Sequence, residues 1–288
     1  MTGAAEEAGS AAYCADLVRG HDFARYASSL FVSADQRRAL LALYAFNAEI
    51  SRVREQVSQP LPGEIRLQWW TDVLAGTARG GVEGSPVATE LLLAVRDFNL
   101  PIQPLLQLIR EHQFDLYDDP MPTMAALEGY ISETSSALFA LAARVAAPTF
   151  QQIDHLARHA GLAQGFAAVI AALPRDASHR QLFLPLQVLQ HHGSGIEEVF
   201  SGKQTPKMRA AIDQLLGEAR QHLSTALALL VEAPPGARPA FLPLALVRRD
   251  IARLSRADND PFVPLLPSRL STLWTLWRAS RSRQFKSG

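Results

Sequence analysis

One short run of the chain carries side chains suited to binding an anion. Arg52 and Arg54 stand two positions apart in the run Ser51-Arg-Val-Arg-Glu55. Guanidinium groups hydrogen-bond readily to phosphate oxygens, so the pair is a candidate site for a phosphate-bearing lipid or prenyl chain. The competing interpretation is an ordinary surface, on which the two arginines pair with Glu49 and Glu55 and remain in solvent. For arginines of this kind the second arrangement is the commoner one.

A second group of charged residues is acidic. Glu111, Asp115, Asp118 and Asp119 recur at three- and four-residue spacing, which brings carboxylates to one side of a helix. Such a strip can offer oxygen ligands to a cation. A solvated helix face has the same pattern and is the more frequent structure, so we expect these residues to be exposed.

Helical periodicity runs along almost the whole chain, and strand signals are scarce. Ser33-Ala-Asp-Gln36 resembles a capping box that opens a helix extending to about Gln56. A later helix is expected over Phe150–Leu173, where Pro174 ends it and leaves Asp176 in a polar loop. The sequence therefore predicts an all-α protein.

No Gly/Ser linker is long enough to separate two domains. We expect a disordered N-terminus over residues 1–10, one helical domain over residues 11–280 and a basic tail over residues 281–288. The last predicted helix, Ser268–Ser280, is amphipathic and has a basic end. It can lie on a membrane surface, or Trp274 and Trp277 can cover the core, and we expect the second.

Composition excludes several classes of function. The 288 residues include 28 Lys and Arg and 28 Asp and Glu, so no net field recruits nucleic acid. The single cysteine, Cys14, excludes a disulfide framework and a Cys-based zinc site. The longest apolar run, Ala160–Leu173, is shorter than the roughly 20 residues of a membrane span, and the N-terminus lacks a signal-like apolar segment. We expect a cytoplasmic protein with, at most, peripheral membrane contact.

Three stretches in order resemble the squalene/phytoene synthase family. They are the segment from Tyr13 to Tyr44-Ala-Phe46, the segment Leu67-Gln-Trp-Trp70, and the segment from Gly161-Leu-Ala163 to Leu182-Phe-Leu-Pro185. Together they extend from Tyr13 to Pro185. The resemblance implies a single-domain helical bundle of the isoprenoid-synthase type.

The family's chemistry joins two prenyl diphosphates head to head, and its magnesium ions bridge the diphosphate to two Asp-x-x-x-Asp motifs. In this chain the first motif falls on Ser51–Glu55 and the second on Ala172–Asp176. Only Glu55 and Asp176 remain of the four carboxylates, too few to organise a metal cluster. The resemblance therefore implies a non-catalytic protein with no metal or other cofactor, and magnesium only if the chain is an enzyme after all.

The resemblance also implies a remnant substrate pocket, although it assigns no catalytic residue. The pocket residues are Arg38, Ser51, Arg52, Glu55, Tyr130, Gln164, Asp176 and Arg180. Tyr130 aligns with a tyrosine that the family places in its active cavity, and an ordinary buried tyrosine fits the same pattern. Arg180 belongs to a basic stretch that approaches the diphosphate in the family.

The details point to one divergent branch of the family. Ala45–Glu49 and Gly161–Gly165, with Phe183-Leu-Pro185, resemble the branch that contains a mitochondrial complex I assembly factor. This implies a scaffold or assembly factor whose protein partner is a respiratory-complex component. Two alternatives stay open: an active prenyl-diphosphate condensing transferase that uses Glu55, Asp176 and Asp115, and an isoprenoid or lipid carrier without turnover.

Overall fold

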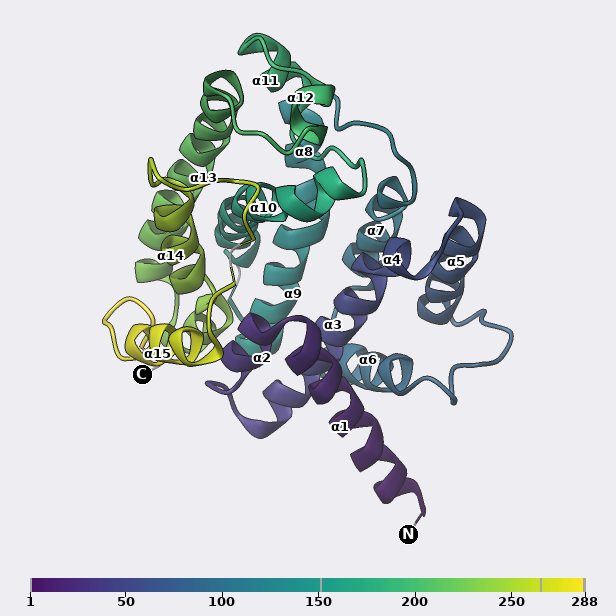
Figure 1. Ribbon diagram of the computed structural model, residues 1–288. Coiled ribbons are helices and arrows are strands. Elements are labelled where there is room, and N and C mark those ends of the chain that lie inside the picture. The colour runs from purple at the N-terminus through teal and green to yellow at the C-terminus, as the bar shows by residue number, and fades with distance from the viewer. Residues whose placement is uncertain (1, 151, 265, 287–288) are drawn as a thin grey trace.

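The computed structural model describes residues 2–150, 152–264 and 266–286, and these residues form helices and loops without a strand (Figure 1). This confirms the predicted all-α fold. The helices of the first half are α1 (Thr2–His21), α2 (Phe23–Ser29), α3 (Ala34–Ser51), α4 (Val53–Gln56), α5 (Pro60–Ala75), α6 (Pro86–Asp97), α7 (Ile102–Glu111), the 3-10 turn η1 (Phe114–Leu116), α8 (Met124–Ile131), the π-helical turn η2 (Ser132–Ser136) and α9 (Ala137–Ala146). The helices of the second half are α10 (Ile153–Ser178), α11 (Leu186–His191), α12 (Ile196–Phe200), α13 (Pro206–Glu232), the 3-10 segment η3 (Pro235–Phe241), α14 (Leu244–Leu254) and α15 (Arg269–Ser280).

Helix α10 forms the centre of the bundle. It packs against α13 and α14 on one side and against α9 and η2 on another (Figure 1). Phe166 and Ile170 of α10 are fully buried. By length and mean hydropathy α10 could cross a membrane, but 67% of its most apolar window is buried among neighbouring helices. We therefore interpret α10 as a core helix.

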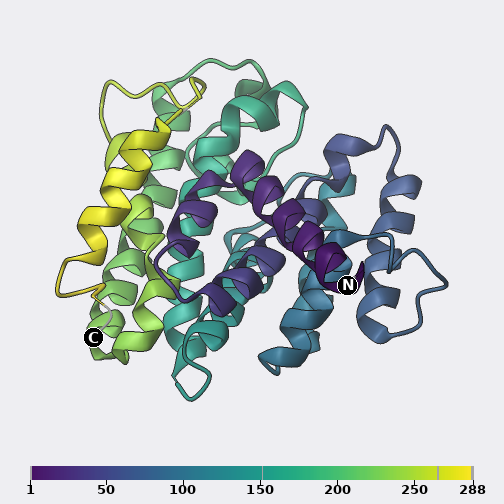
Figure 2. The same ribbon diagram turned by 90° about the horizontal axis from the view of Figure 1, so that it is seen from below.

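The N-terminal helices form a second packed layer. Helix α1 crosses α3 and α6, as the view from below shows (Figure 2). Arg38 of α3 donates from Nε and from a terminal nitrogen to the two carboxylate oxygens of Glu90 on α6, at 2.6 and 2.8 Å. Glu90 is only 2% exposed. This bidentate ion pair joins α3 to α6 inside the layer.

The capping box at the start of α3 is confirmed. Ser33 Oγ accepts a hydrogen bond from the Gln36 amide, and Gln36 Oε1 accepts one from the Ser33 amide. The helix ends earlier than predicted: α3 stops at Ser51, and the chain resumes as the short α4 after Arg52.

The end of α10 corrects a prediction. The helix continues through Pro174 to Ser178, so the prediction that Pro174 ends it and leaves Asp176 in a loop is wrong. Proline removes one backbone donor, a loss that a helix can accommodate when packing holds the turns on both sides. Here Leu173 and Ala177 are both buried on either side of Pro174. Asp176 consequently lies in the last turn of α10, where it too is buried.

The two ends of the chain also differ from expectation. Helix α1 begins at Thr2, within the segment predicted to be disordered. The strong helix formers Ala4, Ala5 and Glu6 explain the difference, because their propensity outweighs that of the neighbouring glycines. In α15, Trp274 and Trp277 are exposed, so the prediction that they cover the core is wrong.

Candidate functional site

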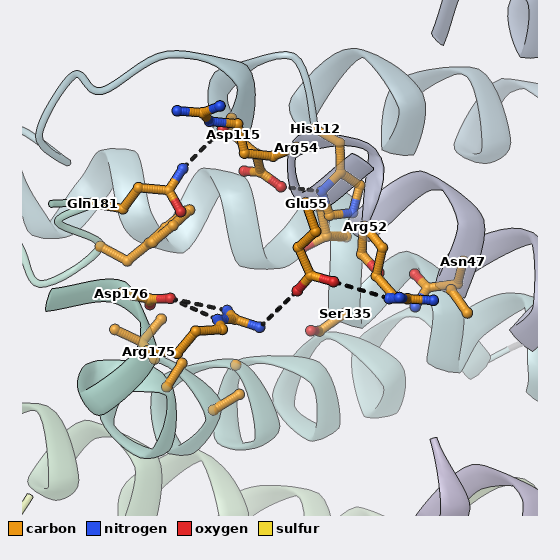
Figure 3. Close-up of a pocket in the computed structure, with 18 of the residues that line it drawn as sticks. Asn47, Arg52, Arg54, Glu55, His112, Asp115, Ser135, Arg175, Asp176 and Gln181 are labelled. Atoms are coloured by element: carbon orange, nitrogen blue, oxygen red, sulfur yellow. Dashed lines mark hydrogen bonds and ion pairs between the residues drawn. The ribbon is translucent and has the colours of Figure 1, made fainter. Parts of the chain in front are cut away.

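A cavity of about 980 Å³ lies between the end of α3, α4, the second half of α10 and the segment from α7 to η2 (Figure 3). Five of the eight predicted pocket residues line it: Ser51, Arg52, Glu55, Tyr130 and Asp176. Four of them come from four separate helices, α3, α4, α8 and α10, and Arg52 lies between α3 and α4.

The other three predicted residues lie outside the lining. Arg38 binds Glu90 in the α1–α3–α6 layer. The side-chain oxygen of Gln164 accepts a hydrogen bond from Arg25, 3.5 Å away, beside the cavity. Arg180 has a positive φ of 56°, and its guanidinium pairs with Glu197 at 3.1 Å.

A chain of ion pairs joins the two retained carboxylates. Glu55 pairs with Arg52 at 3.0 Å and with Arg175 at 3.6 Å, and Arg175 pairs in turn with Asp176 at 3.0 Å. Figure 3 shows the Arg175 guanidinium between the two carboxylates. The arginine therefore supplies positive charge between α4 and α10, at the positions where the family resemblance implies metal ligands.

This donor set does not fit a magnesium cluster. Ser51 and Ala172 provide no carboxylate, and both remaining carboxylates are engaged by Arg175. Among the described residues, no group of three or more His, Cys, Asp and Glu side chains is placed to hold a metal ion. The face of α10 toward the cavity is instead formed largely by small residues, including Gly165, Ala168 and Ala172.

A hydrogen-bonded group that the sequence did not predict lies on the opposite wall. Asp115 Oδ2 lies 2.6 Å from His112 Nδ1, and the Tyr130 hydroxyl donates to Asp115 Oδ1 at 2.9 Å. Gln181 donates to the Asp115 carbonyl at 2.9 Å. The Asp115 side chain is only 13% exposed, so the prediction of a solvated acidic strip is wrong at this residue. In the sequence, the three-residue spacing between His112 and Asp115 was the signal that could have indicated this hydrogen bond.

The surroundings of the cavity raise the pKa of two acidic side chains, Tyr130 and Asp176. Burial raises the pKa of Tyr130 well above its usual range, and the Asp115 carboxylate raises it further. Burial also raises the pKa of Asp176, and the Arg175 guanidinium offsets part of that rise. Tyr130 is therefore a neutral phenol at physiological pH and serves as a hydrogen-bond donor.

Further positive charges line the cavity. Arg25 is paired with Asp22 at 2.7 Å, and Arg54 reaches Asp118 at 3.3 Å. Arg52 lies 2.8 Å from His21 Nε2. Since each of these arginines already has a partner, an anionic ligand would have to exchange existing ion pairs for its own.

Two glycines of α10 let helices approach closely beside the cavity. A Cβ at Gly161 would overlap Ser136 of η2, and one at Gly165 would overlap the Ile131 side chain. The π-helical turn therefore lies directly on α10, with the Ser136 hydroxyl donating to the Arg158 carbonyl at 3.1 Å. This contact holds the segment that carries Tyr130 and Ser135 against the cavity.

Known proteins resemble the chain over most of its length. A mouse protein described as NADH dehydrogenase (ubiquinone) complex I, assembly factor 6 is 33% identical over 90% of this chain and 78% of its own length. A phytoene synthase from Thermus thermophilus is 27% identical over 84% of this chain and 83% of its own. The chain is thus similar to both an assembly factor and an enzyme.

The fold is shared with solved prenyl synthases. The squalene synthase HpnC from Alicyclobacillus acidocaldarius superposes with a TM-score of 0.74 at 20% identity, covering 91% of this chain and 97% of that one. At that identity the likeness establishes the fold alone. The sequence pattern of squalene/phytoene synthases matches residues 18–278. The chain therefore belongs to the squalene/phytoene synthase family.

Proposed function

We propose that this protein is a non-catalytic assembly factor for respiratory complex I that acts in the cytoplasm. The observation that carries the proposal is the chain of ion pairs from Glu55 through Arg175 to Asp176. The Arg175 guanidinium lies between Glu55 and Asp176, the two carboxylates that remain of the family's metal motifs. There it repels a divalent cation and occupies the oxygens that would bind it. The named role of the mouse, rat and human relatives supports assembly of a respiratory complex as the activity that replaced synthesis.

The test is disruption of the gene in its native cell. We expect a loss of assembled complex I and of NADH:ubiquinone oxidoreductase activity in the membranes, with succinate dehydrogenase activity unchanged as the internal control. Complementation with Glu55→Gln should restore the complex, because the proposal gives that carboxylate no catalytic part. Normal complex I in the disrupted strain would overturn the proposal.

A second measurement separates the scaffold from the enzyme. The purified protein is incubated with magnesium and farnesyl diphosphate or geranylgeranyl diphosphate, and the extract is analysed for condensed hydrocarbon. We expect no product. Product formation that is lost in Glu55→Gln would establish the prenyltransferase alternative instead.

The cavity favours one further candidate, an isoprenoid or lipid carrier. A volume of about 980 Å³ is large enough for a prenyl chain, and Ile131, Val169 and Phe183 contribute apolar lining. Lipid extraction and mass spectrometry of the protein purified from its native cell test this function. A stoichiometric lipid that is absent from an Ala172→Phe variant, whose side chain enters the cavity, would support the carrier.

A further inference from the structure

An exposed apolar stripe runs along α15 and the residues just before it. It consists of Leu266, Leu270, Trp274 and Trp277, and we call it the α15 stripe. Leu270 is 80% exposed and Trp274 is 61% exposed, and the two indoles stack at 5.0 Å. At 100° per residue, the three members within the helix fall within about 60° of one another. They form one continuous face.

The helix is nevertheless firmly seated in the bundle. Thr272, Leu276 and Ala279, on the opposite side of α15, are buried, and the helix packs on α14 and α2. Figures 1 and 2 place α15 at the edge of the molecule in both views. The opposite side of α15 therefore completes the core without the α15 stripe. Within the described residues, no other helix covers the stripe.

The charges along the C-terminal segment that carries the stripe are of one sign. No acidic residue follows Asp260, whereas the segment beyond it contains five basic residues: Arg269, Arg278, Arg281, Arg283 and Lys286. Arg269 and Arg278 lie on opposite flanks of the stripe by helical geometry. Arg281 stacks on Trp277, with its guanidinium carbon 4.2 Å from the ring centroid. A chain with zero net charge thus concentrates positive charge beside its most exposed apolar residues.

We propose that the α15 stripe docks the protein on the surface of an anionic lipid bilayer. Indole and leucine side chains enter the boundary between headgroups and acyl chains, while the flanking arginines contact lipid phosphates. This inference does not depend on the proposed role in complex I assembly. It fixes the orientation of the bundle, with α15, α14 and α2 nearest the membrane.

Charge distinguishes this surface from the other exposed apolar area. On α5, Leu61 and Ile65 are also exposed, but the groove beside them is lined by two carboxylates, Glu64 and Asp72, against one arginine, Arg79. Carboxylates there would be repelled by anionic headgroups. The α5 area therefore provides a matched control of similar apolar exposure and opposite local charge.

Vesicle flotation of the full chain tests the proposal. We expect binding to vesicles of phosphatidylcholine mixed with phosphatidylglycerol, weak binding to phosphatidylcholine alone, and release as salt is raised. Trp274→Ser with Trp277→Ser should weaken partitioning at least about tenfold, because two buried indoles are lost. Arg278→Gln with Arg281→Gln should weaken it about 25-fold, at about fivefold per charge. The control Leu61→Ser with Ile65→Ser should bind as the wild type does.

Folding of each variant is checked by thermal unfolding, and each variant should keep a cooperative transition. The midpoint of Trp274→Ser with Trp277→Ser should fall slightly, because Trp277 is only 41% exposed. Tryptophan emission provides a second readout: anionic vesicles should shift the wild-type spectrum to the blue and leave Trp274→Phe with Trp277→Phe unshifted. Failure to bind anionic vesicles, binding by both α15 variants as strong as that of the wild type, or loss of binding in the α5 control would each overturn the proposal. Binding of a protein partner to the α15 stripe without any binding of lipid vesicles would also overturn the proposal.

Discussion

Arg175 pairs with Glu55 at 3.6 Å across the cavity and thereby ties the end of α10 to α4. The same guanidinium holds Asp176 at 3.0 Å. A bound metal ion would neutralise these carboxylates through its own charge, whereas here the Arg175 side chain supplies the positive charge.

The first prediction concerns the pH dependence of Asp176. Burial raises the pKa of this carboxyl above its ordinary 3.8, so the folded protein holds the proton more tightly than the unfolded chain. The free energy of unfolding therefore falls as the pH rises from 3.8 through the pKa of Asp176 in the folded protein, because the carboxyl ionises more readily in the unfolded chain. Asp176→Asn should match the wild type in acid and exceed its stability at neutral pH. Urea unfolding across this pH range measures the difference.

A paired variant isolates the contribution of Arg175. Because the guanidinium offsets part of the rise in the Asp176 pKa, Arg175→Gln should make the pH dependence steeper. The same substitution in the Asp176→Asn background should remove that effect. Parallel pH curves for the wild type and Arg175→Gln would contradict the ion pair.

The second prediction concerns the contact between α10 and the π-helical turn. Gly161→Ala should lower the free energy of unfolding by about 3 kcal/mol, because the added Cβ overlaps the Ser136 backbone. Gly217→Ala, at an exposed position of α13 with open space around it, should instead stabilise by about 0.5–1 kcal/mol. Denaturant unfolding of both variants is the measurement. Equal effects would mean that α10 does not lie this close to Ser136.

The third prediction concerns the ion pair between α3 and α6. Arg38→Met should lower the free energy of unfolding by about 3 kcal/mol, because the buried Glu90 loses two charged hydrogen bonds. Adding Glu90→Leu should recover much of the loss, since an apolar pair leaves no buried charge. A double variant that is less stable than Arg38→Met would show that Glu90 has a further role.

The sequence correctly predicted helix boundaries that depend on hydrogen bonds between residues close together in the chain. The Ser33 capping box fixes the start of α3 by hydrogen bonds within four residues, so the sequence alone was sufficient. The prediction that Pro174 ends α10 was wrong because it considered only the backbone hydrogen bond that proline removes. The burial of Leu173 and Ala177 against other helices, which the sequence does not show, keeps the helix continuous. Asp115 has the spacing of a solvated strip, and only the fold brings Tyr130 within 2.9 Å of it.

The same distinction applies to the cavity and the last helix. Family motifs pointed to Ser51, Glu55 and Asp176, and all three lie on the cavity wall. The motifs gave no indication of Arg175, which lies one residue before Asp176 and acts through a contact with another helix. The amphipathic pattern of α15 is compatible with either face turned inward, and only packing on α14 and α2 leaves Trp274 outside.

The last prediction concerns restoring the metal motifs. Ser51→Asp with Ala172→Asp would rebuild two carboxylate pairs at four-residue spacing, one ending at Glu55 and the other at Asp176. We expect this double variant to bind no magnesium, because the new carboxylates face Arg52 and Arg175 in the same cavity and will pair with them. Adding magnesium with farnesyl diphosphate should leave the thermal unfolding midpoint unchanged.

A third substitution turns this expectation into a test of Arg175. In the triple variant with Arg175→Ala, the carboxylates of Glu55 and Asp176 lose that partner, and we expect magnesium alone to stabilise the protein. Saturation at a hundred times the dissociation constant would add about 2.7 kcal/mol, which a melting curve resolves. Condensed product should still be absent, because Gly165 and Ala168 cannot supply the hydrogen bonds that orient metal ligands. Magnesium-dependent stabilisation of the double variant, or no magnesium-dependent stabilisation of the triple variant, would mean that Arg175 does not stand in for the metal.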